Sequence, residues 1–555
     1  MTEAQFDYII VGAGSAGCVL ANRLTASGRH RVLLLEAGED DRWMWIRIPA
    51  GIAHILTGER AIWRFQTEPD EKVAGRSLFW PRGRALGGSS AVNGMIWVRG
   101  DPLEYDQWES FGNEGWDLQS VLPYLKRMEQ YEHGDPEFRG NEGPMYITRY
   151  RDRDPLTEGF IAAARQAGVP ETIDYNGPVF EGVGYLQHNV RRGRRRHAAD
   201  NYLLPAMKRA NLTVESKALA QRVVMEGRKA VGVVYRKGLE ERTVRARREV
   251  IVTAGAIQSP QLLELSGIGQ GAVLKRAGID VVHELPGVGE NLRDHLHVRL
   301  SFETKLPVTL NTILRNPLHR AKMGARWLFL GRGLMACSSA TSMAIARSRP
   351  DLQRPDIKFQ LHQLSMASSH YGGNHKSRNI ADRMGLDTHG GFGIGAYVLR
   401  PESRGSIHVK SADASKPPEI HANYLSHDYD VQTMLAALRM IRKVAAQPAL
   451  AQHIVRETRP GPDAADDDAL LEHVRNTGQT SYHPIGTCRM GNDREAVVDA
   501  MLRVRGLEGL RVCDASIMPT MVGSNTNAPS IMIGEKASDM VLAAAGESGQ
   551  EQHIR

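Results

Sequence analysis

The chain has 555 residues, of which 42% are hydrophobic, 24% charged and 6% aromatic. This composition is typical of a globular protein and excludes a disordered or fibrous chain, and at about 150 residues per domain the length predicts two to four domains. The 70 Lys and Arg exceed the 63 Asp and Glu by a formal net charge of +7. That excess is too small at this length to indicate a nucleic-acid partner.

Targeting and metal signals are weak. No apolar run approaches the length of about 18 residues that a membrane-spanning helix needs, and the acidic N-terminus does not resemble a signal peptide. We therefore expect a cytoplasmic protein, with peripheral attachment to the inner membrane face as an alternative. The four cysteines are far apart, which predicts neither a disulfide framework nor a metal site. The one dense basic run, residues 191–196, lacks interleaved aromatic residues and is interpreted as a solvated loop.

A dinucleotide-binding turn is predicted near the N-terminus. The apolar run at residues 8–11 ends in a glycine-rich turn, and residues 16–24 follow with apolar positions at helical spacing. This order is typical of a strand, a tight turn and a helix whose N-terminus receives a pyrophosphate. The predicted cofactor-binding residues in this turn are Gly12, Gly14, Ser15, Ala16 and Gly17.

A second apolar strand supports this interpretation. Residues 31–35 end at Glu36, about 20 residues beyond the glycines, where a carboxylate accepts hydrogen bonds from the adenosine ribose. Glu36 and the following Ala37 are therefore predicted to contact the cofactor. Because the glycine spacing has only this one match, there is no obvious second site for a nicotinamide, which favours a flavin that meets the substrate directly.

Two further segments point to a known family. Residues 83–95 are too rich in glycine and serine for a regular strand and predict a loop that wraps a ligand. Together with residues 255–269 and 285–292, this loop resembles the signatures of the glucose-methanol-choline (GMC) oxidoreductases, FAD enzymes that oxidise alcohols. The resemblance extends from Tyr8 to about Val541.

The resemblance implies an α/β fold with a Rossmann-type FAD-binding domain. It also implies a discontinuous α+β substrate-binding domain built on a mostly antiparallel sheet. The FAD-binding domain is expected at residues 1–160, 190–298 and 470–545, the substrate-binding domain at 161–189 and 299–469, and a tail at 546–555. Residues 370–389, rich in Gly, His and Asn, are expected to form a mobile loop beside the substrate entrance.

The resemblance also assigns residues to the cofactor. FAD is expected to be noncovalent, because Val92 stands where some relatives attach the flavin through a histidine. Asp514 ends an apolar run at 510–513 and is expected to hold the ribityl and phosphate region. The implied cofactor residues beyond the turn are Arg84, Gly87, Gly88, Ser89, Asn93, Gly94, Met95, Val223, Asp514, Ala515 and Asn525.

For the chemistry, the resemblance implies that His483 is the base that takes the hydroxyl proton while hydride passes to flavin N5. Asn527 is expected to donate a hydrogen bond to the substrate oxygen. The resemblance does not settle the electron acceptor, which stays open among oxygen, a quinone and another carrier, and the oligomeric state stays open too.

A primary alcohol other than a sugar is the expected substrate, because residues 76–83 resemble those of aliphatic alcohol dehydrogenases. Choline-oxidising relatives carry a glutamate at the position of His297, and a neutral imidazole attracts a quaternary ammonium less than a carboxylate does. An aromatic cage including Trp43, Trp45, Trp63 or Trp327 would be another way to hold such a cation. Choline oxidation and a non-redox hydroxynitrile lyase of the same fold remain the alternatives.

Overall fold

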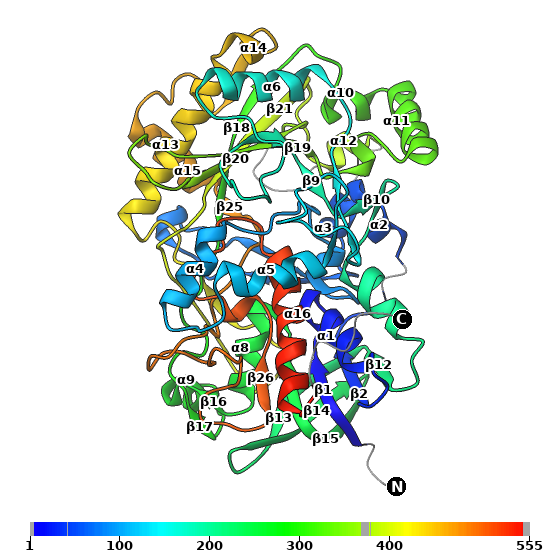
Figure 1. The fold of residues 1–555 in the computed structure, drawn as a ribbon. Helices are drawn as coiled ribbons and strands as arrows, with labels where there is room; N and C mark the ends of the chain where they lie inside the picture. Colours follow the sequence, from blue (N-terminus) through cyan, green and yellow to red (C-terminus); the bar gives the residue numbers. More distant parts are fainter. Residues whose placement is uncertain (1–4, 41–42, 368–376, 378, 548–555) are drawn as a thin grey trace.

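Two seven-stranded sheets occupy opposite ends of the molecule, one in the lower and one in the upper half of Figure 1. The computed structural model describes residues 5–40, 43–367, 377 and 379–547. Within these residues, no helix is long and apolar enough to cross a membrane.

The first sheet has a parallel centre and an antiparallel edge. Its order is β12-β2-β1-β15-β14-β13, with β26 also paired to β15. The central strands are buried apolar runs, as expected where helices cover both faces of parallel strands. The strands are β1 (Gln5–Val11), β2 (Val32–Glu36), β12 (Leu212–Ser216), β13 (Ala218–Glu226), β14 (Lys229–Lys237), β15 (Glu240–Val252) and β26 (Leu510–Val512). The strands predicted at 8–11, 31–35 and 510–513 are thus confirmed.

Helices α1 (Ser15–Thr25) and α16 (Asn527–Ala544) pack together beside this sheet. Almost all of α16 is buried, including Glu535, whose carboxylate forms ion pairs of 2.8 Å with both Arg23 and Arg127. Burial opposes ionisation of Glu535, but the two guanidinium groups outweigh it and lower the pKa of this carboxyl. The N-terminal and C-terminal segments are therefore joined by apolar packing and by a buried charge network.

The second sheet is antiparallel, in the order β24-β18-β21-β20-β19-β8, with β25 paired to β18. Helices α6 (Pro155–Gln166), α13 (Asp428–Ala445) and α15 (Asp467–Thr477) pack against it, and α13 contains the helix predicted near residues 434–444. The strands are β8 (Gly182–Tyr185), β18 (Leu296–Glu303), β19 (Ala340–Ala346), β20 (Ile357–His362), β21 (Gly391–Val398), β24 (Arg456–Arg459) and β25 (Gln479–Thr480).

The basic run at 191–196 differs from its prediction. It forms a hairpin of β10 (Val190–Arg191) and β11 (Arg194–Arg195), and the Arg195 side chain is fully buried. The Arg195 guanidinium donates to the carbonyl oxygen of Asn93 at 2.6 Å and to its Oδ1 at 2.9 Å. The prediction of a solvated loop is therefore wrong for Arg195. Its buried guanidinium holds the glycine-rich loop through these two hydrogen bonds to Asn93.

Two predicted features lie partly beyond the described structure. Residues 370–376 and 378 of the predicted entrance loop are outside the described residues, and the remainder includes the short helix α12 (Ile380–Arg383). Residues 548–555 of the predicted tail are likewise outside them.

Candidate active site

One long pocket extends from the first sheet to the second. At one end it is lined by the turn after β1 and by the end of β2, and at the other by residues of β18, β20 and β21. Loop residues 88–95, the start of α8 (Gly255–Leu265) and C-terminal segments around residues 483, 514 and 525 line the middle. Residues that are hundreds of positions apart in the sequence therefore share a single chamber.

The turn after β1 has no room for side chains at two of its glycines. Gly12 has a φ of +106°, and a Cβ there would lie 2.6 Å from the carbonyl oxygen of Thr253. A Cβ on Gly17 would lie 2.0 Å from the carbonyl oxygen of Gly12. Gly12 and Gly17 therefore let α1 begin directly after β1, with the N-terminal amides of the helix near the pocket. This is the arrangement that binds a pyrophosphate.

Glu36 ends β2 at the same edge of the sheet. Its two carboxylate oxygens accept hydrogen bonds from the backbone N–H of Ala13 at 2.9 Å and of Gly38 at 2.8 Å. Burial raises the pKa of Glu36 to about 7, although these two backbone donors oppose the shift. The carboxyl is thus fixed in the pocket wall at the position expected for a ribose contact.

The glycine-rich loop lies against this turn. The N–H of Gly87 donates to the carbonyl oxygen of Ala13 at 2.8 Å, and Asn93 Oδ1 accepts from the N–H of Met95 at 2.9 Å. Predicted cofactor residues that line the pocket are Gly12, Gly14, Ser15, Ala16, Glu36, Ala37, Gly88, Ser89, Asn93, Gly94, Met95, Asp514, Ala515 and Asn525. Gly17, Arg84 and Gly87 are not among the lining residues.

Val223 is placed away from the pocket. It lies in β13, and its N–H donates to Ser266 Oγ at 2.8 Å. The part of β13 that lines the pocket is its first three residues, Ala218, Leu219 and Ala220. The structure therefore does not support the assignment of Val223 to the cofactor.

Asp514 accepts hydrogen bonds from three donors of the chain. One carboxylate oxygen accepts from the N–H of Gly255 at 2.9 Å and from Ser259 Oγ at 2.6 Å, and the other accepts from the N–H of Ser516 at 2.8 Å. This carboxylate joins the end of β26 to the start of α8 at the pocket wall, an arrangement that is more typical of a residue that holds a binding site together than of a base.

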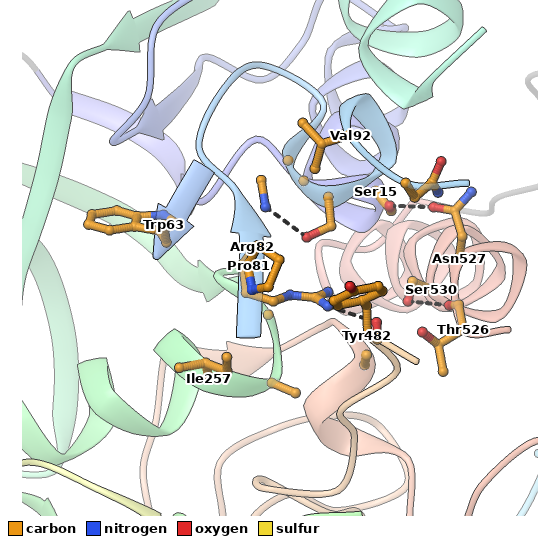
Figure 2. A pocket seen from close by; sticks show the side chains of 18 of the residues that line it. Ser15, Trp63, Pro81, Arg82, Val92, Ile257, Tyr482, Thr526, Asn527 and Ser530 are labelled. Carbon is orange, nitrogen blue, oxygen red and sulfur yellow. Dashed lines mark hydrogen bonds between the residues drawn. The ribbon is translucent and has the colours of Figure 1, made fainter. Parts of the chain in front are cut away.

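The two asparagines of the C-terminal segment lie in different places. Asn525 Nδ2 is 2.9 Å from Nε2 of His483, whereas Asn527 Oδ1 accepts from Ser15 Oγ at 2.8 Å. Figure 2 shows Ser15 and Asn527 facing each other at the start of α16. The sequence prediction paired His483 with Asn527, but the structure brings Asn525 to the histidine and leaves Asn527 at the dinucleotide turn.

A chain of hydrogen bonds defines which nitrogen of His483 carries the proton. Nε2 of His295 faces the carbonyl oxygen of Leu399 at 2.9 Å, and a carbonyl only accepts, so this nitrogen carries a hydrogen. Neutral His295 then has its lone pair on Nδ1, which lies 2.9 Å from Nδ1 of His483. His483 therefore donates from Nδ1 and keeps its lone pair on Nε2, the nitrogen that faces Asn525.

Burial keeps both rings neutral. It lowers the pKa of His295 to about 3 and that of His483 well below the usual value, and the charge of Lys358 acts in the same direction on each. Lys358 Nζ donates to Asn525 Oδ1 at 2.8 Å, which turns the Nδ2 group of Asn525 toward His483. The backbone N–H of His483 donates to Asp294 Oδ1 at 2.8 Å, so the histidine is fixed from both sides.

Sequence reasoning missed Lys358 and Arg82. In β20 the residues alternate between apolar ones and Lys358, Gln360 and His362, and such alternation in a fully buried strand indicates a polar chamber on one side. Arg82 lines the pocket and donates to the carbonyl oxygen of Tyr482 at 2.8 Å (Figure 2). Arg82 lies within the stretch 76–83 that resembles aliphatic alcohol dehydrogenases, but that resemblance gave it no role.

Of the four tryptophans considered for an aromatic cage, Trp63 alone is among the residues that line this pocket in the described structure. Trp45 stacks on His54 with ring centroids 4.0 Å apart, and Trp327 Nε1 donates to the carbonyl oxygen of Gly193 at 2.7 Å. A cage built from several of these rings is therefore not formed.

Comparison with known proteins identifies relatives of the whole chain. Two family models, both described as GMC oxidoreductase, match residues 6–297 and 401–534. An oxygen-dependent choline dehydrogenase of Photobacterium profundum is 43% identical over 97% of this chain and 93% of its own length. The oxygen-dependent choline dehydrogenase of Brucella anthropi is 43% identical over 99% of this chain and 98% of its own length. The crystal structure of pyridoxine 4-oxidase from "Mesorbium loti" superposes with a TM-score of 0.85 at 30% identity, over 96% of this chain and 98% of that one.

Proposed function

Because the chain belongs to the GMC oxidoreductase family, and is therefore an FAD-dependent oxidoreductase acting on CH–OH groups, we propose that it oxidises a primary alcohol other than a sugar to the aldehyde. The observation that carries this proposal is the 2.9 Å contact between Nε2 of His483 and the Asn525 amide at the wall of the pocket.

The pocket fits FAD. The Gly12 turn admits a phosphate close to the backbone, and Glu36 stands at the ribose position. The buried Nδ2 of Asn527 lines the pocket and has no hydrogen-bond partner in the described structure, as expected for a donor to a ligand. Val92 lines the same region and offers no nucleophile for a covalent link. When bound, FAD supplies the two-electron acceptor for the hydrogen that leaves the carbinol carbon.

His483 and Asn525 prepare the alcohol. The substrate hydroxyl takes the place of the Asn525 hydrogen at the lone pair of His483 Nε2 and donates its proton there. This nitrogen serves as the base because the ring is neutral and its Nδ1 hydrogen is committed to His295. Asn525 Nδ2 carries a second hydrogen, which it donates to the substrate oxygen as negative charge develops there. Lys358 is a positioning residue, because it acts on the substrate through the Asn525 amide.

Asn525 thus replaces Asn527 in the proposed role. The geometry on which this rests is the 2.9 Å contact between Asn525 and His483, against the 2.8 Å contact between Asn527 and Ser15. Asn527 is proposed to act on the cofactor side instead.

Choline is a second candidate because the curated relatives are named as choline dehydrogenases. Because these relatives are named as oxygen-dependent, we also propose oxygen as the electron acceptor. Against choline, the carboxylates among the described lining residues are Glu36 and Asp514, which both lie in the cofactor region. A quaternary ammonium at the His483 end would meet no opposite charge from these residues.

The test is an anaerobic screen of the FAD-loaded protein with aliphatic, aromatic and amino alcohols. We expect a primary alcohol to bleach the oxidised flavin spectrum and to yield one aldehyde per flavin. Readmission of oxygen should restore the spectrum and consume oxygen. Release of a carbonyl compound from a cyanohydrin while the flavin stays oxidised, with no alcohol reducing it, would refute the proposal in favour of a lyase.

A further inference from the structure

One face of the second sheet forms the end of the pocket beyond His483. The register of β18, β21 and β20 places Arg299 opposite Gly395 and Gly395 opposite Gln360. One row closer to His483, His297 lies beside Tyr397, with ring centroids 6.3 Å apart, and Tyr397 lies 5.9 Å from the ring of His483. We call this the polar sheet face, and its pocket-lining residues are His297, Arg299, Gln360, His362 and Tyr397.

Gly395 makes room in the middle of this face. A Cβ there would lie 2.3 Å from Nε2 of His297 and 3.0 Å from Cγ of Arg299. Both side chains therefore lie over the glycine, between the flanking strands. Two residues of a strand span about 6.8 Å. The row that contains Arg299 is therefore separated from the row beside His483 by about the length of a short carbon chain.

Several polar atoms of this face have no protein partner. Arg299 Nε, His297 Nε2 and Gln360 Oε1 are buried and without a hydrogen bond in the described part of the chain. The one side-chain contact of the Arg299 guanidinium in that part is with the sulfur of Met366 at 3.8 Å, and no carboxylate pairs with it. Buried polar groups are normally satisfied, so the unpaired Arg299 Nε donor, with His297 Nε2 one row away on the same pocket wall, indicates a ligand that carries an acceptor. Gln360 Oε1 only accepts, so such a ligand group does not complete it.

The charges on the polar sheet face indicate the charge of the ligand group that binds there. Burial, followed by the charge of Arg299, lowers the pKa of both His297 and His362, so these rings are neutral. Arg299 then supplies a positive charge that no carboxylate of the described residues pairs with, and its planar guanidinium matches a carboxylate in two parallel hydrogen bonds.

We infer that the alcohol substrate carries a carboxylate at the end remote from its hydroxyl, and that Arg299 binds this carboxylate at the polar sheet face. The inference rests on the proposed function, since it assumes that the hydroxyl lies at His483 and Asn525. It assigns Arg299 as a specificity-determining residue and makes the substrate class a hydroxycarboxylate.

The experiment compares straight-chain hydroxycarboxylates, diols and amino alcohols matched in length, by anaerobic flavin reduction in the FAD-loaded protein. We expect the hydroxycarboxylate to have the highest kcat/KM. Arg299→Gln should lower that value by about 10- to 100-fold while changing the diol by less than about threefold, which is the effect of losing a charge-assisted hydrogen bond. Arg299→Glu should shift the preference to the amino alcohol. Arg456→Gln, at an arginine of β24 whose side chain is 70% exposed, is the matched control and should change none of these.

A second readout does not depend on turnover. Calorimetry with an unreactive straight-chain carboxylate and the oxidised holoenzyme should detect binding that weakens about 10-fold or more in Arg299→Gln. Wild-type preference for the amino alcohol, equal use of all three classes, or absence of carboxylate binding would overturn the inference. If no alcohol reduces the flavin but the carboxylate binds through Arg299, the proposed function fails and the anion site stands.

Discussion

Replacing Lys358 with methionine tests how the amide of Asn525 is oriented. The Lys358 side chain is fully buried, and Nζ donates to Asn525 Oδ1 at 2.8 Å and to Ser524 Oγ at 3.1 Å. Methionine fills a similar volume but donates nothing, so the Asn525 amide loses the donor that holds its oxygen and is free to rotate away from His483. The donor to the substrate oxygen is then lost.

The magnitude follows from the interaction removed. A hydrogen bond to a charged group contributes about 1.5–3 kcal/mol, and an oriented donor at a developing oxyanion contributes about 3 kcal/mol. At 1.36 kcal/mol for each factor of ten, we expect Lys358→Met to slow flavin reduction by about 10- to 100-fold. Because burial lowers the pKa of Lys358 to about 7, the folded state disfavours its charged form. Wild-type stability should therefore rise between about pH 7 and 10.5, and the variant should lack this rise.

The assay is anaerobic stopped-flow reduction of the bound flavin across a pH series, with thermal unfolding measured on the same samples. Removing the Lys358 charge should also raise the pKa of His483 and move the acid limb of the profile to higher pH. Lys229→Met, at an exposed lysine of β14, is the matched control. A folded Lys358→Met protein that reduces its flavin at the wild-type rate with an unmoved pH profile would refute the orienting role of Lys358.

Four further substitutions probe other parts of the structure. Asn525→Ala should slow flavin reduction by about 100-fold with FAD affinity retained, whereas Asn527→Ala should mainly weaken FAD binding, and the reverse result in a titration with FAD would contradict the assignment. Glu535→Gln should destabilise the protein by about 3 kcal/mol in urea unfolding, because two arginines lose their buried partner. His408 has its pKa raised to about 9, since hydrogen bonds to Glu264 and Glu290 outweigh its burial. Its stabilising contribution is complete below about pH 6.5 and is lost as the pH rises through 9, so His408→Gln should flatten that part of the stability profile, and an unchanged slope would count against it.

The sequence predicted the dinucleotide-binding half well because its signals are local. The turn at Gly12 and the strand end at Glu36 are defined by a few adjacent residues whose backbone geometry depends on glycine and on apolar runs. The parallel centre of the first sheet and the antiparallel second sheet match the fold implied by the family resemblance.

The sequence did not identify which asparagine is the partner that we propose for His483. Asn525 and Asn527 are two positions apart, and which of them faces His483 depends on where α16 begins, a tertiary feature set by its packing against α1. Val223 lies outside the pocket lining for a similar reason, because the register of β13 decides which of its residues reach the pocket. Arg195 was misinterpreted because a run of arginines looks solvated until a buried acceptor such as Asn93 is known.

The most direct test of the proposed mechanism is anaerobic flavin reduction in His483→Ala. We predict that this variant binds FAD with an ordinary oxidised spectrum and that a substrate alcohol reduces it at least about 100-fold more slowly than the wild type. Reduction at the wild-type rate would show that the proton of the alcohol leaves by another route and would contradict the role of the His483 imidazole as the base.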